Sequence, residues 1–105
     1  MPEFVFAYHG GTRPSSPEEG AKLMKEWRAW MSGLGDAVVD PGKPVGKSHT
    51  VSAKGVTKDG GANPIAGFTV VKAASLDAAV AMAKPCPHVK NGGTIEVAEA
   101  MDMEM

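Results

Sequence analysis

The sequence predicts an α+β fold in which a ferredoxin-like βαββαβ protomer forms an antiparallel sheet of about four strands with both helices on one face. Three observations support this prediction. Two runs of strand-forming residues, 4–8 and 65–73, lie in the two halves of the chain. Each run is followed by a helix that begins at a capping serine. Further strand signals follow each helix.

The first half opens with the apolar strand 4–8, which ends at a pair of glycines. The residues at 16–19 then predict a helix start. Ser16 can accept from the N–H of Glu19, Glu19 can reach back to the N–H of Ser16, and proline suits the first helical position. Apolar residues recur along this helix with a helical period, which predicts one buried face. They are Leu23, Met24, Trp27, Trp30 or Met31, and Leu34.

The middle of the chain carries shorter strand signals at 37–39, 47–53 and 55–57. The sequence Asp40-Pro41-Gly42 predicts a break after the first of them, and residues 58–61 predict a turn after the last. In the expected order of strand, helix, strand, strand, helix, strand, this region supplies the strand or strands after the first helix.

The second half contains the strongest strand signal, 65–73, which is rich in β-branched and aromatic residues. Ser75 caps the helix that follows, and Pro85 ends that helix. The helix is rich in alanine, so it is narrow enough to lie close to a sheet. Residues 94–98 form the last predicted strand.

The chain has 105 residues, the size of one domain, which we expect to span residues 1–100 and to leave a flexible tail at 101–105. So short a chain buries only about two thirds of its unfolded surface. The sheet face opposite the helices also needs cover. We therefore expect a homodimer in which a second copy supplies that cover.

The charge balance argues against several classes of partner. The formal net charge is −1 and the lysines are spread along the chain, so neither nucleic acid nor an anionic membrane is an expected partner. No run approaches the ~20 apolar residues that a membrane span needs, and the start of the chain does not resemble a signal peptide. Cys86 is the one cysteine, which fits a reducing compartment. A cytoplasmic location is predicted.

Four segments of the second half carry a resemblance to a known family. They are Gly67-Phe68, Ser75-Leu76-Asp77-Ala78-Ala79, Cys86-Pro87-His88 and Gly92-Gly93-Thr94-Ile95-Glu96-Val97. In this combination they resemble the YCII-related proteins, also called the DGPF domain family. The resemblance implies a dimeric α/β barrel, in which two ferredoxin-like sheets pack face to face.

The resemblance also bears on function. Some YCII-related proteins are small-molecule enzymes, including a dehydrochlorinase of chlorinated hydroxyhydroquinone, and others are accessory domains of alternative sigma factors. The enzymes are expected to use a His–Asp pair, and the resemblance places the aspartate at Asp36. This chain departs from the family pattern in two ways. Its first predicted helix has no histidine, and Asp59-Gly60-Gly61-Ala62 replaces the Asp-Gly-Pro-Phe motif.

His9 is the first candidate for chemistry, because it follows a strand directly and precedes a glycine pair. Its imidazole could exchange protons near neutral pH, with Asp36 as its orienting partner. The alternative is a structural histidine that is hydrogen-bonded to the loop backbone.

The Cys86-Pro87-His88 turn is the second candidate. Cys86 and His88 could act as a nucleophile and its base, or the flanking prolines could give the turn a purely structural role. One cysteine and three scattered histidines lack the spacing of a zinc site, so no metal and no cofactor are expected. Tyr8 and Trp27 are candidate ligand-binding residues, although such residues pack more often in a core or an interface.

Two functions from different classes follow. The first is cofactor-free proton transfer or elimination on a small, aromatic or lactone-like molecule. It would use His9, Asp36 and His88 as catalytic residues and Tyr8 and Trp27 to hold the ligand. The alternative is a non-catalytic accessory or ligand-binding module, for example one associated with sigma-factor regulation. The two departures from the family pattern favour this alternative.

Overall fold

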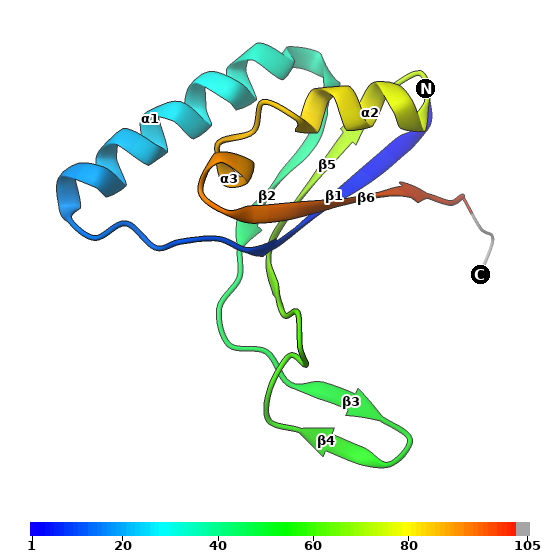
Figure 1. Ribbon diagram of the computed structural model, residues 1–105. Coiled ribbons are helices and arrows are strands. Elements are labelled where there is room, and N and C mark those ends of the chain that lie inside the picture. Colours follow the sequence, from blue (N-terminus) through cyan, green and yellow to red (C-terminus); the bar gives the residue numbers. More distant parts are fainter. Residues whose placement is uncertain (103–105) are drawn as a thin grey trace.

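The computed structural model describes residues 1–102, which form a four-stranded sheet, helices along one face and a separate hairpin (Figure 1). The main sheet contains β1 (Glu3–Gly10), β2 (Val38–Pro44), β5 (Ile65–Lys72) and β6 (Gly93–Ala100). The helices are α1 (Pro17–Leu34), the 3₁₀ turn η1 (Gly35–Ala37), α2 (Leu76–Ala83) and the single-turn α3 (Pro87–Lys90). The hairpin consists of β3 (Thr50–Ser52) and β4 (Gly55–Thr57).

The strand order confirms the predicted ferredoxin-like protomer. The sheet runs β2-β5-β1-β6, and each neighbouring pair is antiparallel. The central strand β1 pairs with β5 through Phe6 and Thr69, and with β6 through Phe6 and Val97. With α1 between β1 and β2 and α2 between β5 and β6, this is the βαββαβ arrangement.

The middle of the chain differs from the prediction. The strand expected at 37–39 continues as β2 to Pro44, through the segment predicted to break it. The register to β5 shifts twice in β2, and Gly42 has a φ of 70°, so the turn residues form a bulge within the strand. The strand expected at 47–53 is only β3, and it pairs with β4 outside the main sheet. Figure 1 shows this hairpin as an arm that projects from the sheet.

Both expected serine caps are present. The hydroxyl of Ser16 accepts from the N–H of Glu19 at 3.1 Å, and that of Ser75 accepts from the N–H of Ala78 at 3.1 Å. The return bond of the first cap differs from the prediction, because the carboxylate of Glu19 accepts from the backbone N–H and the hydroxyl of Ser15. These two bonds from Ser15 lower the pKa of Glu19.

The core lies between the sheet and the helices. Phe4, Phe6 and Tyr8 alternate along β1, and all three are buried beneath the helices. Phe6 stacks near Trp30 of α1, with ring centroids 6.2 Å apart. The indole N–H of Trp30 donates to the carbonyl of Met82 at 3.0 Å and so ties α1 to α2.

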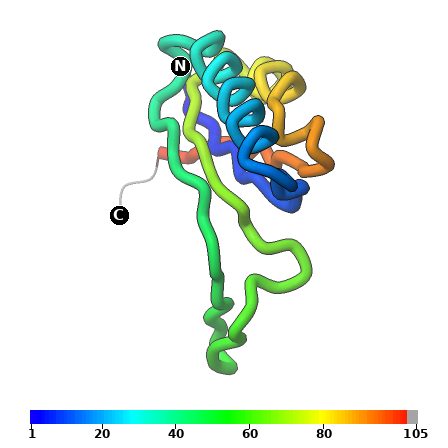
Figure 2. Tube along the Cα trace, turned by 90° about the vertical axis from the view of Figure 1, so that its left-hand side faces the viewer, coloured from blue at the N-terminus to red at the C-terminus, as the bar shows by residue number. Residues whose placement is uncertain are grey.

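The opposite face of the sheet carries no described helix (Figure 2). The homodimer predicted to cover this face stays a prediction, as does a cytoplasmic location. Among the described residues, no helix is long and apolar enough to span a membrane. We still propose a single domain at 1–100, whose last strand ends at Ala100. Part of the expected tail, residues 103–105, lies outside the described residues.

Candidate functional site

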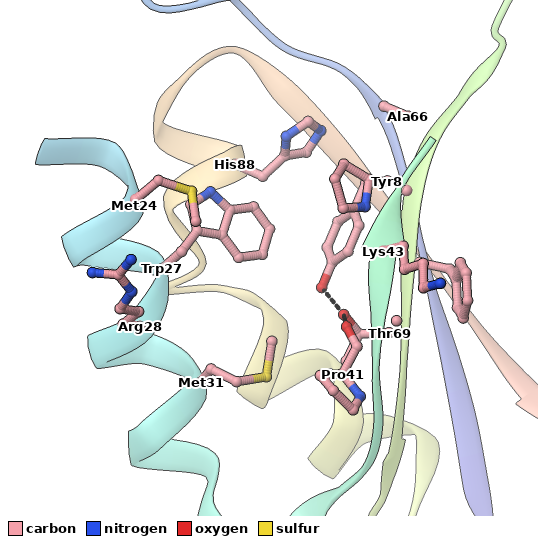
Figure 3. Close-up of a pocket in the computed structure, with 14 residues that line it drawn as sticks. Tyr8, Met24, Trp27, Arg28, Met31, Pro41, Lys43, Ala66, Thr69 and His88 are labelled. Atoms are coloured by element: carbon pink, nitrogen blue, oxygen red, sulfur yellow. Dashed lines mark hydrogen bonds between the residues drawn. The ribbon is translucent and has the colours of Figure 1, made fainter. Parts of the chain in front are cut away.

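A cavity of about 400 Å³ lies between α1 and the sheet, beside the bulged strand β2. This volume is within the range of small-molecule sites. Figure 3 shows Trp27 and Met31 projecting from α1 toward Tyr8 and Thr69 of the sheet, with His88 at one end. The cavity therefore has mainly apolar and aromatic walls and few polar side-chain atoms.

His88 is held by a hydrogen bond from its ring to the backbone of β1. Its Nε2 lies 2.8 Å from the carbonyl oxygen of His9. Because a carbonyl can only accept, Nε2 carries a proton, and Nδ1 is the acceptor of the neutral ring. A neutral imidazole in this tautomer keeps Nδ1 as its basic nitrogen.

The ring of His88 packs against two glycines, where a larger residue would clash with it. A Cβ at position 93 would overlap Nε2 of the ring, and a Cβ at position 11 would lie 2.8 Å from its Cε1. Gly11 also has a φ of 97°, which side-chain-bearing residues rarely adopt. The glycines that follow β1 and begin β6 thus make room for the imidazole rather than for a phosphate group.

The Cys86-Pro87-His88 turn forms the start of α3. Pro87 occupies the first helical turn, which suits its fixed φ, and Cys86 is completely buried. Cys86 is not among the residues that line the cavity, whereas His88 is. Of the two residues first considered as a nucleophile and its base, only the histidine faces the space where a ligand would lie.

Tyr8 and Trp27 form the aromatic part of the wall. The rings of Tyr8 and Trp27 meet edge to face with centroids 5.2 Å apart, and those of Tyr8 and His88 lie 5.5 Å apart. The hydroxyl of Tyr8 donates to Oγ1 of Thr69 at 2.7 Å. Burial raises the pKa of Tyr8, so the phenol stays neutral at physiological pH.

The side chain of His9 lies on the other face of the sheet. Successive side chains of a strand point to opposite faces, so Tyr8 faces the helices and His9 faces away from them. Nε2 of His9 lies 3.2 Å from Oε1 of Glu96 in β6. Its Nδ1 lies 3.1 Å and 3.3 Å from the carbonyl oxygens of Asn63 and Pro64. The ring thereby links the base of the hairpin arm to β1 and β6.

The structure thus brings together three of the five residues that the sequence singled out: Tyr8, Trp27 and His88. Asp36 is exposed in η1 and does not line the cavity. The carboxylate that His9 contacts is Glu96, so the expected pairing of His9 with Asp36 is replaced by a different partner.

Sequence reasoning also missed Thr69 and the glycines around His88. Gly93 was a usable signal, because a glycine in a predicted strand indicates close approach by another group, and in the structure Gly93 is buried against the imidazole.

The buried thiol of Cys86 makes the stability of the folded state depend on pH in the alkaline range. Burial raises the pKa of its thiol from the ordinary 9.0 to about 11. The unfolded chain therefore loses this proton first, and the stabilisation present below pH 9 is lost as the pH rises toward 11. We expect the free energy of unfolding to fall by at most about 1.4 kcal/mol per pH unit in this interval.

Denaturant titrations at several pH values above neutrality measure this slope. Cys86→Ala should be less stable at neutral pH, but its slope between pH 9 and 10 should be smaller than that of the wild type. Equal slopes in the two proteins would contradict the assignment to Cys86. The buried Tyr8 adds a loss of the same sign only above its ordinary pKa of 10.0.

The comparisons with known proteins agree with this architecture. The model of the YCII-related domain matches residues 5–104. The chain belongs to the YCII-related family. No curated protein is similar enough to count as a match.

One solved structure similar to this YCII-related protein is 5-chloro-2-hydroxyhydroquinone dehydrochlorinase from Burkholderia phenoliruptrix AC1100, in complex with 2,5-dihydroxybenzoquinone. The two chains share 19% sequence identity and a TM-score of 0.55, and the alignment covers 92% of this chain and 93% of the other. At this identity the likeness shows that the two chains share a fold.

Proposed function

We propose that this YCII-related protein is an enzyme that binds a small aromatic molecule between α1 and the sheet, and that His88 transfers a proton to or from it. The observation that carries the proposal is the combination of an apolar, aromatic-walled cavity with one imidazole whose Nε2 proton is already bound to the His9 carbonyl. The activity of the structurally similar dehydrochlorinase supports a reaction on an aromatic ring.

The proposed step uses Nδ1 of His88 as a general base. It takes a proton from a hydroxyl of the substrate, and the electron pair left on the oxygen moves into the ring system. In an elimination, this proton is delivered to the ring carbon that bears the halide, which gives a ketone. His88 then takes a proton from a second hydroxyl, the halide departs with the electron pair of its bond to carbon, and the imidazolium returns that second proton to solvent. The sum is loss of one H⁺ and one halide ion, so the step balances without an oxidant or reductant.

The other residues have simpler roles in this proposal. Trp27 and Tyr8 hold the flat faces and edges of the substrate ring, and the backbone carbonyl of His9 keeps the ring of His88 in one tautomer. The imidazole of His9 and the carboxylate of Asp36 take no direct part, because neither is among the cavity-lining side chains.

Anaerobic addition of 5-chloro-2-hydroxyhydroquinone to the wild-type protein tests the proposal. We expect released chloride, and a change in the ¹⁵N signals of the His88 ring but not of the exposed His49 ring. Binding without chloride release or exchange of a substrate proton would favour the non-catalytic ligand-binding alternative. Chloride release with no change at His88 would contradict this cavity as the site.

A further inference from the structure

The residue His9 connects the two faces of the sheet at the end of β1. Its backbone carbonyl accepts from the ring of His88 on the helix side, while its imidazole contacts three groups on the opposite face. We propose that the imidazole of His9 is a positioning residue, which holds the end of β1 in place and thereby sets the orientation of the His88 ring. This inference rests on the proposed function and adds to it a side chain that acts from outside the cavity.

The end of β1 is irregularly paired on one side. Along β6 its register is regular up to Gly10. Along β5 the register shifts between Tyr8 and His9, so that His9 lies opposite Ile65. The residues that follow are Gly10 and Gly11, with φ values of 67° and 97°, and glycine leaves the backbone more conformational freedom than any other residue. The carbonyl of His9 therefore lies where a regular strand gives way to a glycine loop.

Nδ1 of His9 bridges this irregular side. It lies 3.1 Å from the carbonyl oxygen of Asn63 and 3.3 Å from that of Pro64, in the segment just before β5. Both oxygens can only accept, so Nδ1 carries a proton and shares it between them. The side chain of His9 is only 12% exposed, so water competes weakly for this proton. These contacts hold β1 against the start of β5 where the ladder is interrupted.

Nε2 of His9 makes the weaker contact. It lies 3.2 Å from Oε1 of Glu96, whose side chain is 70% exposed. With the proton on Nδ1, Nε2 of the neutral ring is an acceptor, so the carboxylate attracts it only when the ring carries a second proton. Exposed ion pairs contribute little to stability. We therefore expect the two carbonyl contacts of Nδ1 to hold the end of β1.

The position of the His9 carbonyl decides how the His88 ring is held. Nε2 of His88 donates to this carbonyl at 2.8 Å, and a displaced carbonyl would lose the bond that keeps the proton on Nε2. His88 itself lies on α3, a single turn that is too short to be rigid by itself. The next bond between this segment and α3 runs from the N–H of Thr12 to the carbonyl of Asn91, beyond both glycines.

Three substitutions of His9 separate the contacts of its two ring nitrogens. His9→Phe keeps an aromatic ring without nitrogens, His9→Asn keeps a donor near the place of Nδ1, and His9→Gln keeps one near the place of Nε2. In the assay with 5-chloro-2-hydroxyhydroquinone, we expect kcat to fall about 10–100-fold for His9→Phe and His9→Gln, because the base is misplaced. KM should stay within about threefold, because His9 does not line the cavity. His9→Asn should recover kcat to within about threefold of the wild type.

The ¹⁵N signals of the His88 ring give a second readout that does not need turnover. In the wild type and in His9→Asn they should show one tautomer, with the proton on Nε2. In His9→Phe they should move toward the average of the two tautomers. His49→Phe is the matched control, because His49 is exposed just before β3, and it should change neither kcat nor the His88 signals.

The outcomes distinguish this inference from the proposed function. Unchanged His88 signals and kcat in a folded His9→Phe protein would overturn the inference and leave the proposed function intact. If circular dichroism shows that His9→Phe does not fold, equal kcat values and equal His88 signals for His9→Asn and His9→Gln would overturn it. Failure of the wild type to release chloride would instead reject the proposed function, and the positioning role would fall with it.

Discussion

His88→Gln is expected to slow the proposed proton transfer by about 10²–10⁴-fold, which is the usual contribution of a positioned general base. The substitution removes the basic Nδ1, while the glutamine amide can still donate to the His9 carbonyl that now accepts from Nε2. Ligand affinity should therefore change by less than about tenfold, because most of the wall comes from Trp27, Tyr8 and apolar side chains.

Steady-state chloride release gives the rate, and fluorescence or NMR titration gives the affinity. His49→Gln is the matched control, because His49 is exposed just before β3 and does not line the cavity. A rate for His88→Gln within a factor of three of the wild type would contradict His88 as the base. A loss of binding alone, with kcat unchanged, would assign His88 to ligand recognition.

Phe6→Ala is expected to lower the free energy of unfolding by about 3–5 kcal/mol. Phe6 is 0% exposed at the centre of β1 and packs near the ring of Trp30. Truncation removes apolar surface and leaves a cavity between the central strand and α1, and both effects destabilise the folded state. Because small domains are stable by only about 5–15 kcal/mol, this one change removes a large share of the total.

Urea unfolding followed by tryptophan fluorescence and circular dichroism measures the change. Val51→Ala is the control, because Val51 is 77% exposed on the hairpin arm and should change stability by less than about 0.5 kcal/mol. Phe6→Leu keeps most of the volume and should cost less than about 1.5 kcal/mol. A similar loss for Val51→Ala and Phe6→Ala would contradict the placement of the core.

The fold was predictable because its signals are local. Each main helix begins at a serine that caps a backbone N–H three residues later, and the β-branched residues of β5 predict a strand. The course of β2 was not predictable in the same way. Asp40-Pro41-Gly42 has the composition of a break, and only pairing with β5 turns it into a bulge. Such pairing involves residues far apart in the sequence, which propensities do not describe.

The candidate site shows the same division. Tyr8, Trp27 and His88 were singled out from their residue types and positions, and they line one cavity. Tyr8 and His9 are consecutive in a strand, so their side chains must point to opposite faces of the sheet. The sequence therefore already indicated that the two residues cannot line the same site, and the functional prediction did not use this signal. Glu96, by contrast, reaches His9 through the register of β1 and β6, which single-sequence patterns do not specify.

The packing of the His88 ring against Gly93 has a consequence for the evolution of the chain. Any side chain at position 93 would occupy the volume of the imidazole, so a substitution there requires that the ring of His88 leave its present place or that the histidine be replaced. The reverse is not true, because a smaller residue at position 88 leaves the glycine harmless. We therefore expect a bulky residue at position 93 of a related chain only together with a residue at position 88 that leaves this volume empty.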